Sequence, residues 1–226
     1  MLTNRKFVIF DMDGILFDTE LLMIRCYETV AAEYSMPDVA SVCRKCIGVN
    51  ASKTQEIFYE HYGDSFPLSE IRNKVVALFR HTTETEGVPV KPYAEELLKY
   101  LKASGYALAL ASSTATEIVI RELKQSGFYD YFDQIIGGDM VTNSKPAPDI
   151  FLVACEKLGS IPGNTYVIED SQNGIRAAYA AGAMPMAVPD LFALPKEIQA
   201  LCTGVFSDLS AVLTFFESLS STNPSK

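Results

Sequence analysis

The segment from Phe7 to Gly14 constrains the fold of this chain more than any other. Phe7–Phe10 is a run of four apolar residues, two of them β-branched, which is typical of a short buried strand. Asp11 and Asp13 follow directly, and alternation along an extended chain points both carboxylates the same way. Like charges this close repel each other unless a cation or a shared proton joins them. The spacing alone leaves two interpretations open, an acidic turn and a metal site.

Composition and charge narrow the class of protein. The chain has 226 residues, of which 48% are hydrophobic and 21% charged, as expected for a soluble globular protein with a full core. The formal net charge of -9 argues against a nucleic-acid partner and against an acidic membrane surface. Five scattered cysteines do not suggest a disulfide framework, and no apolar run is long enough to span a membrane. We therefore expect a cytoplasmic protein, with a monomer as the default.

The apolar periodicity divides the chain into two regions. Residues 18–87 have helical periodicity with no strand between them, which predicts a small all-helical domain. From residue 88 onward strands and helices alternate, which predicts βαβ units and a parallel sheet covered on both faces. The predicted core domain therefore comprises residues 1–17 and 88–219, and the polar residues 220–226 are predicted to be a disordered tail.

The individual elements follow from the same periodicity. The expected strands are residues 7–10, 106–111, 134–137, 165–168 and 184–188. The expected helices are residues 18–34, 52–62, 69–84, 92–105, 115–127, 147–159 and 172–182.

Polar side chains follow the expected strands at their carboxyl ends, which is where open parallel sheets bind ligands. These side chains are Asp11, Asp13, the hydroxyls of Ser112, Ser113 and Thr114, then Lys145, Glu169 and Asp170. Phosphoryl transfer requires a nucleophile, a divalent cation, and cationic or hydrogen-bonding groups around the phosphoryl oxygens. Because the set supplies all of these from four separate segments, we expect a phosphoryl-transfer site at this edge.

These segments resemble, in order, the four motifs of the haloacid dehalogenase superfamily. The matching segments are Asp11–Gly14, the hydroxyl after Leu108–Ala111, the Lys145–Pro146 loop and Glu169–Asp170. The helical insertion resembles the cap of the branch that contains phosphatases and β-phosphoglucomutases, and the likeness spans nearly the whole chain. It implies an α/β fold, with a Rossmann-like parallel sheet core and an inserted all-helical cap that closes over the site. It also implies a small phosphorylated metabolite as the substrate and Mg²⁺ as the cofactor.

The resemblance also implies a role for each site residue. Asp11 would form an aspartyl-phosphate, and Asp13 would act as acid and base, which requires a raised pKa. Ser112 and Lys145 would hold the phosphoryl oxygens. The implied Mg²⁺ ligands are Asp11, the backbone carbonyl of Asp13, Glu169 and Asp170. The expected substrate contacts are Gly14, Thr19, Ser113, Thr114, Asn50 and Lys53.

Three of these contacts have an equally simple structural interpretation. Thr19 could begin a helix, and Asn50 and Lys53 could lie in a solvated loop between two cap helices. The sequence alone leaves these alternatives open.

The motifs favour one of several reactions that this superfamily supports. Asp13 and the Glu169–Asp170 pair argue against the dehalogenase branch, and the filled catalytic positions argue against an inactive binding protein. A β-phosphoglucomutase must hold a second phosphate, and the positions that do so in its pattern correspond here to Met23, Ala115 and Ala51. We therefore predict a phosphatase that hydrolyses a small phosphate monoester, with a sugar phosphate mutase as the alternative. The motifs do not identify the leaving group.

Overall fold

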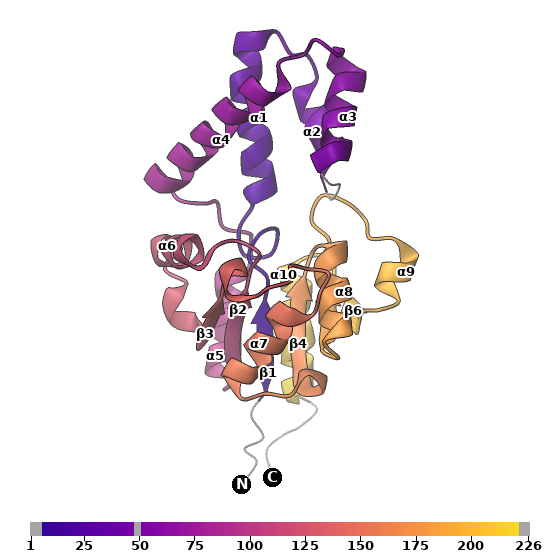
Figure 1. The fold of residues 1–226 in the computed structure, drawn as a ribbon. Coiled ribbons are helices and arrows are strands. Elements are labelled where there is room, and N and C mark those ends of the chain that lie inside the picture. The colour runs from indigo at the N-terminus through magenta and orange to yellow at the C-terminus, as the bar shows by residue number, and fades with distance from the viewer. Residues whose placement is uncertain (1–5, 48–50, 222–226) are drawn as a thin grey trace. The chain divides into compact units, whose positions relative to one another are not determined.

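The computed structural model describes residues 6–47 and 51–221, which form two compact units (Figure 1). The sheet unit consists of the described residues of Met1–Phe17 and Val90–Lys226, and the helical unit consists of those of Asp18–Pro89. The chain therefore crosses between the units twice, at residues 17–18 and 89–90. Within the described ranges, no helix is long and apolar enough to cross a membrane.

The sheet unit is built on six parallel strands in the order β3-β2-β1-β4-β5-β6. The strands are β1 (Phe7–Phe10), β2 (Ala107–Ala111), β3 (Gln134–Ile136), β4 (Thr165–Glu169), β5 (Met184–Ala187) and β6 (Gly204–Val205). β1 lies between β2 and β4, with Phe10 paired to Leu110 on one side and to Ile168 on the other. This arrangement confirms the predicted α/β fold class.

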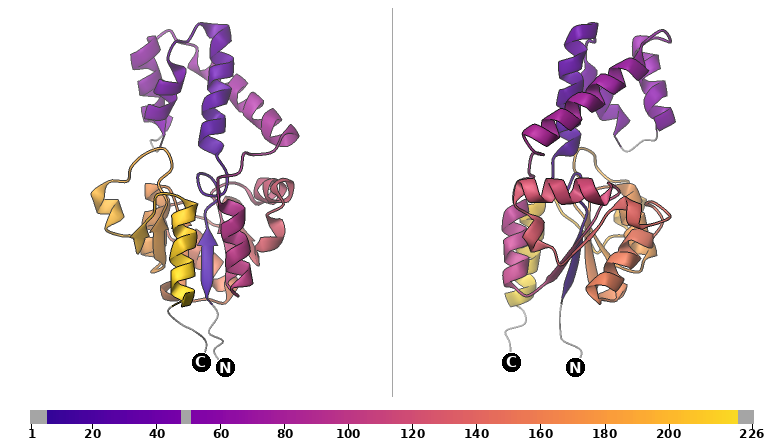
Figure 2. Two further views of the ribbon diagram at one scale, coloured as in Figure 1. Left: turned by 180° about the vertical axis from the view of Figure 1, so that it is seen from behind. Right: turned by 60° about the vertical axis from the view of Figure 1, so that its left-hand side comes forward.

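Helices cover both faces of the sheet (Figure 2). They are α5 (Ala94–Ala103), α6 (Thr116–Ser126), α7 (Asp149–Leu158), α8 (Gln172–Ala180), α9 (Lys196–Gln199) and α10 (Leu209–Ser221). Short 3-10 turns occur at Tyr129–Tyr131, Gly138–Met140 and Pro162–Asn164. On one face, Ile9, Ala109 and Val167 of the central strands pack in a core with α7 and α8. Because both faces are covered, the strands are mainly apolar on both faces rather than alternating between apolar and polar residues.

The opposite face of the sheet is closed by aromatic packing against α10. The ring of Phe216 is fully buried and lies edge-to-face against the rings of Tyr106 and Tyr166, each with a centroid distance of 5.4 Å. Such pairs stabilise a core beyond the burial of their surface. The helix α10 therefore holds the second layer in place.

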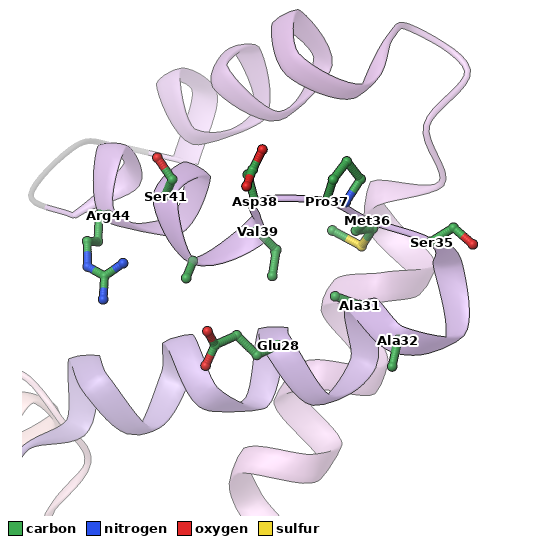
Figure 3. Close-up of a pocket in the computed structure, with 11 residues that line it drawn as sticks. Glu28, Ala31, Ala32, Ser35, Met36, Pro37, Asp38, Val39, Ser41 and Arg44 are labelled. Atoms are coloured by element: carbon green, nitrogen blue, oxygen red, sulfur yellow. The ribbon is translucent and has the colours of Figure 1, made fainter.

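The helical unit consists of α1 (Thr19–Tyr34), α2 (Val39–Cys46), α3 (Ala51–Tyr62) and α4 (Leu68–Thr85). Its core includes an aromatic cluster in which the buried ring of Phe58 contacts the rings of Tyr27, Tyr62 and Phe66. An open groove of about 860 Å³ lies between α1 and α2, with Glu28 and Arg44 on its facing sides (Figure 3).

Besides the short 3-10 turns, three helices and one strand of the described chain were not predicted from the sequence: α2, α9, β6 and α10. The first three are short, and α10 is rich in serine and phenylalanine without a clear polar face. α10 also includes the first two residues of the predicted disordered tail. The end of α10 is attached to α5 at this point, because the hydroxyl of Tyr100 donates to the hydroxyl of Ser220 at 3.0 Å. Residues 222–226 lie outside the described residues.

Replacing Phe216 by alanine tests the importance of the α10 layer. We expect Phe216→Ala to lower the free energy of unfolding by about 3–5 kcal/mol, because it removes a fully buried ring and leaves a cavity. Urea unfolding followed by circular dichroism measures this loss. The control is Leu152→Ala on α7, whose side chain is 44% exposed and whose loss should cost less than about 1 kcal/mol. Equal losses in the two variants would contradict this account of the core.

Candidate active site

Neighbouring strands bring polar side chains to the carboxyl edge of the sheet. Asp11 directly follows β1, Ser112 directly follows β2, and Glu169 is the last residue of β4. The Asp11 amide donates to the Ile168 carbonyl at 3.0 Å, so backbone pairing continues past the end of β1. Both Ser112 and Glu169 are buried, and Asp11 is only 7% exposed. The sheet register therefore positions these polar groups, as expected at the carboxyl ends of parallel strands.

The loop after β1 is a tight turn that depends on Gly14. Its amide donates to the Phe17 carbonyl at 2.9 Å, and its φ of +77° lies in the left-handed region that glycine adopts without strain. A Cβ atom at this position would lie 2.4 Å from Oδ2 of Asp170. Glycine is therefore required both for the turn and for the close approach of the Asp170 carboxylate.

Lys145 connects the acidic groups of different strands. It lies in the loop before α7, and its Nζ donates to Oδ1 of Asp11 at 2.5 Å and to Oε1 of Glu169 at 2.7 Å. Nζ also donates to the carbonyl of Ala111 at 3.2 Å and lies 5.0 Å from the centre of the Phe151 ring. The lysine side chain is 7% exposed, so it is a buried cation surrounded by hydrogen-bond acceptors.

Asp11, Glu169 and Asp170 form a cluster that could hold a metal ion. One carboxylate oxygen from each lies within 4.8 Å of the others. An all-oxygen donor set suits a hard cation such as Mg²⁺. Three carboxylates outweigh the one ammonium group of Lys145, and the excess negative charge favours a divalent cation. The residues present therefore fit the predicted magnesium site.

The two oxygens of Glu169 have different partners. Oε1 accepts from Lys145, whereas Oε2 accepts from the backbone amide and the hydroxyl of Ser171, both at 3.0 Å. The Ser171 hydroxyl in turn accepts from the Gly174 amide at 3.0 Å and so caps α8. A Cβ atom on Gly174 would lie 1.7 Å from Oε1 of Glu169. Glu169 is therefore fixed between Lys145 and the first turn of α8.

Asp13 lies beside the hydroxyl groups that follow β2. Its Oδ2 accepts a hydrogen bond from the Thr114 hydroxyl at 3.3 Å. The Ser112 hydroxyl accepts from the Thr114 amide at 3.0 Å, which leaves the hydroxyl proton of Ser112 able to donate. Asp13 and Thr114 are half-buried, whereas Ser113 is exposed. The structure thus brings Asp13 and Thr114 together beside Ser112.

The charges of Asp11 and Lys145 affect each other's ionisation. Burial is the main cause that raises the pKa of Asp11 to about 7; the charge of Lys145 opposes this rise, and the charges of Glu169 and Asp13 add to it. Burial alone would lower the pKa of Lys145, but Asp11 and Glu169 together hold it above its usual value. Lys145 is therefore a cation throughout the physiological range. A divalent cation at the acidic cluster would favour the ionised form of Asp11.

Two of the predicted substrate contacts, Thr19 and Lys53, lie in the helical unit rather than in the sheet unit. Thr19 is the first residue of α1, and Lys53 is an exposed residue of α3 whose ammonium pairs with Glu56 at 2.6 Å. Both belong to the helical unit, whereas the cluster is formed by residues of the sheet unit. Asn50 lies outside the described residues.

Sequence reasoning missed Glu122, a buried acid on α6. Its side chain is 6% exposed, and burial raises its pKa to about 7 with a further contribution from the charge of Asp13, opposed by Arg121. Nη2 of Arg121 lies 3.5 Å from Oε1 of Glu122. The signal was present in the periodicity, because Glu122 shares the buried face of α6 with Val119 and Leu123.

The structure also contains a long-range ion pair that no local pattern predicts. Lys91, just after the second crossing between the units, pairs with Asp190 in the loop after β5. Both side chains are largely buried. This pair attaches the segment after the crossing to the carboxyl edge of the sheet.

Sequence comparisons identify similar proteins over most of the chain. A family model described as haloacid dehalogenase-like hydrolase matches residues 8–188. The phosphorylated carbohydrates phosphatase of Thermotoga maritima is 34% identical over 77% of this chain and 81% of its own length. A probable pseudouridine-5'-phosphatase of Drosophila melanogaster is 32% identical over 80% of each chain. The fructose-1-phosphate phosphatase YqaB of Escherichia coli is 32% identical over 77% of this chain and 92% of its own.

Solved structures show the same architecture. A putative β-phosphoglucomutase from Thermotoga maritima has a TM-score of 0.79 and 29% identity, covering 95% of this chain and 99% of its own. A hydrolase from Deinococcus radiodurans has a TM-score of 0.82 and covers 97% of this chain and 96% of its own. The latter is 23% identical, so its likeness is one of fold.

The buried carboxyl group of Glu122 predicts a pH dependence of stability. In the folded protein its pKa is about 7, above the ordinary value of 4.5, so the folded state binds this proton more tightly than the unfolded state. The resulting stabilisation is complete below pH 4.5 and is lost as the pH rises through 7. We expect metal-free Glu122→Gln to gain roughly 1–2 kcal/mol of unfolding free energy over the wild type between about pH 5 and pH 8. Urea unfolding at a series of pH values measures the difference.

Glu117→Gln is the matched control for this experiment, because Glu117 is exposed on the same helix. Its stability should follow the wild type at every pH. A Glu122→Gln profile parallel to the wild type would contradict the raised pKa.

Proposed function

Because the chain belongs to the haloacid dehalogenase-like hydrolases, we propose that it is a magnesium-dependent phosphatase of small phosphorylated metabolites. The reaction is the hydrolysis of a phosphate monoester through an aspartyl-phosphate on Asp11. The helical unit serves as the cap that selects the leaving group. Relatives named as phosphatases support the reaction type.

One observation carries this proposal most directly. The buried Asp11 carboxylate lies in contact with the Lys145 ammonium and within a cluster of carboxylate oxygens at the carboxyl edge of the sheet. A nucleophile, a fixed cation and a potential metal site therefore meet in one place. Phosphoryl transfer needs these groups together, because the charge on the phosphoryl oxygens must be neutralised while the nucleophile approaches.

In the first step, a carboxylate oxygen of Asp11 forms a bond to phosphorus as the bond from phosphorus to the ester oxygen breaks. The electron pair of the broken bond remains on the ester oxygen, which takes a proton from Asp13 and departs as an alcohol. The hydrogen bond from the Thr114 hydroxyl helps to orient the Asp13 carboxyl group.

In the second step, a water molecule attacks the same phosphorus atom. Asp13, now ionised, takes the water proton while the bond between phosphorus and Asp11 breaks. Inorganic phosphate leaves, and both aspartates return to their starting states. Asp13 must therefore alternate between its two protonation states in every cycle.

Lys145 and Ser112 hold the phosphoryl group during both steps. The lysine provides a fixed positive charge, and the Ser112 hydroxyl can donate because its oxygen already accepts from the Thr114 amide. Asp11, Asp170, Glu169 and the Asp13 backbone carbonyl would hold Mg²⁺, which when bound supplies additional positive charge for the phosphoryl oxygens.

The mutase alternative is less well supported. A phosphoglucomutase must hold a second phosphate, and Met23 stands at one of the positions that would be used for it. Met23 is a half-buried apolar side chain on α1. Although one similar structure is named a putative β-phosphoglucomutase, the most similar relatives reported above carry phosphatase names. Hydrolysis is therefore the preferred reaction.

The direct test is an assay for phosphate release with Mg²⁺ and a panel of sugar phosphates and nucleoside monophosphates. We expect release from at least one member, and a loss on the order of 10³-fold or more in kcat for Asp11→Asn, which removes the nucleophile. Asp130→Asn is the matched control, because Asp130 is exposed in the turn at Tyr129–Tyr131. Conversion of β-glucose 1-phosphate to glucose 6-phosphate without phosphate release would overturn the phosphatase assignment.

Replacing Asp170 tests the metal site separately. We expect Asp170→Asn to raise the Mg²⁺ concentration for half-maximal activity by roughly 10–100-fold, because one carboxylate ligand is lost. Mg²⁺ should also raise the Tm of the wild type more than that of the variant, which measures binding without activity. Asp130→Asn again serves as the control. Identical Mg²⁺ responses in Asp170→Asn and the wild type would contradict the assigned site.

A further inference from the structure

The loop that carries Asp13 is held in place by residues far along the chain. Asp13 and Phe17 form one isolated β-bridge, and Phe17 and Val90 form another. The amide of Lys91 donates to the carbonyl of Leu16 at 2.9 Å. All of these residues belong to the sheet unit. The position of the loop therefore depends on where Val90 and Lys91 lie.

The side chain of Lys91 is attached to a buried carboxylate. Its ammonium group donates to Oδ1 of Asp190, and the two side chains are 19% and 7% exposed, respectively. The second oxygen, Oδ2, is buried and has no hydrogen-bond partner among the residues that the structure describes. Because a buried carboxylate is strongly disfavoured without a counter-charge, the Asp190 side chain depends on the ammonium group of Lys91.

Asp190 is in turn fixed to the strand that ends in Glu169. β5 pairs with β4 as far as Ala187 and Glu169, and the Val188 amide donates to the Glu169 carbonyl at 2.8 Å. Asp190 follows two residues after Val188. β4 pairs with β1, and the chain passes from β1 into the loop with Asp13. The ion pair closes this path into a ring, because backbone pairing supplies the links between the strands.

The chemistry of this ion pair is better suited to positioning than to stability. Taking two charges out of water costs free energy, which their attraction repays only when the remaining hydrogen-bonding groups are also satisfied. In the described part of the chain, Oδ2 of Asp190 is not satisfied. Two apolar side chains of similar volume often stabilise a fold as well or better. An apolar pair does not supply a directed contact that fixes one backbone segment relative to another.

We propose that Lys91 and Asp190 are positioning residues for proton transfer by Asp13. They hold residues 11–17, here called the Asp13 loop, so that the carboxyl group of Asp13 reaches the ester oxygen in the first step and the attacking water in the second. Neither Lys91 nor Asp190 acts on the substrate itself. The proposal rests on the phosphatase function proposed above and adds the residues that orient its acid and base. A displacement of about 1 Å at such a group can lower the rate on the order of 100-fold.

Removing both charges separates positioning from stability. Lys91→Met alone leaves the Asp190 carboxylate buried without its cation, so we expect a lower Tm and a lower kcat. Lys91→Met/Asp190→Leu leaves neither charge of the pair, and we expect a Tm close to that of the wild type but a kcat lower on the order of 10–100-fold. KM should change less than about threefold, because the groups that hold the phosphate are intact. A double variant with the wild-type kcat would overturn the proposal.

Two matched variants accompany this pair. Lys91→Arg keeps the charge and can donate to both oxygens of Asp190, so we expect it to keep at least about a third of the wild-type kcat. Lys99→Met makes the same change as Lys91→Met at an exposed position of α5, where the ammonium group pairs with Glu95 at 2.8 Å. Its kcat and Tm should equal those of the wild type. A loss of kcat in Lys91→Arg as large as that in Lys91→Met would contradict a role for the ion pair.

The leaving group provides a readout that a purely structural role would not change. An alcohol departs with a proton from Asp13, whereas p-nitrophenolate departs with little need of one. The ratio kcat/KM reports the steps up to the departure of the leaving group. For the double variant we therefore expect kcat/KM to fall on the order of tenfold more with an alkyl phosphate than with p-nitrophenyl phosphate. Equal proportional losses with the two esters would overturn the assignment to proton transfer.

Hydrogen exchange measures the constraint on the Asp13 loop without turnover. The amides of Leu16 and Phe17 donate to the Met12 carbonyl at 2.9 and 3.1 Å, and these bonds protect them from exchange. In Lys91→Met/Asp190→Leu without substrate, we expect peptides that cover residues 12–17 to exchange at least about threefold faster, while peptides from α7 keep the wild-type rate. Unchanged exchange in residues 12–17 would overturn the proposal.

These outcomes separate the role of the ion pair from the function on which it rests. If the wild type releases phosphate from no ester of the panel, the phosphatase function fails, and the role in proton transfer fails with it. If the wild type releases phosphate, and the double variant matches it in kcat and in hydrogen exchange, the phosphatase function stands and the positioning role fails.

Discussion

The ammonium group of Lys145 lies between two buried carboxylates, 2.5 Å from Asp11 and 2.7 Å from Glu169. Removing the lysine would leave two buried carboxylates without their counter-charge, which is strongly unfavourable. The three residues come from the loop before α7, from the end of β1 and from β4. This interaction therefore joins parts of the chain that are separated by 134 and 24 residues. The loop before α7 can reach the site because the sheet has already brought β1 and β4 side by side.

The contact with Lys145 also connects the reaction site to the surrounding scaffold. Glu169 holds the lysine with one oxygen and the capping residue Ser171 with the other, so the start of α8 and the lysine are fixed together. Gly14 and Gly174 allow carboxylates to approach the backbone more closely than a side chain would permit. These contacts all lie in the sheet unit. The residues proposed for the phosphoryl chemistry thus form one connected set within this unit.

Much of the sheet and the acidic cluster could be predicted because their signals are local. A buried strand is a short apolar run, and a carboxylate directly after it must lie at the edge of the sheet. The family resemblance added the roles of Lys145 and Ser112. The burial of Glu122 was missed although its spacing from Val119 places it on the buried face of α6, because a carboxyl group is ordinarily assigned to the exposed face. The pair formed by Lys91 and Asp190 joins residues 99 positions apart, which no local pattern predicts. The substrate contacts could not be predicted as clearly. The motifs belong to the phosphoryl group that all substrates share, whereas the cap residues depend on the leaving group, which differs between substrates.

The central claim is that Asp11 becomes phosphorylated during the reaction. The most direct measurement is acid quenching of the enzyme with Mg²⁺ and substrate within the first turnover, followed by peptide mass spectrometry. We expect a phosphoryl group on the peptide that contains Asp11, which appears before free phosphate and disappears as substrate is exhausted. Phosphate release at the normal rate with no modification of Asp11 at any time would contradict it, because water would then attack the ester directly.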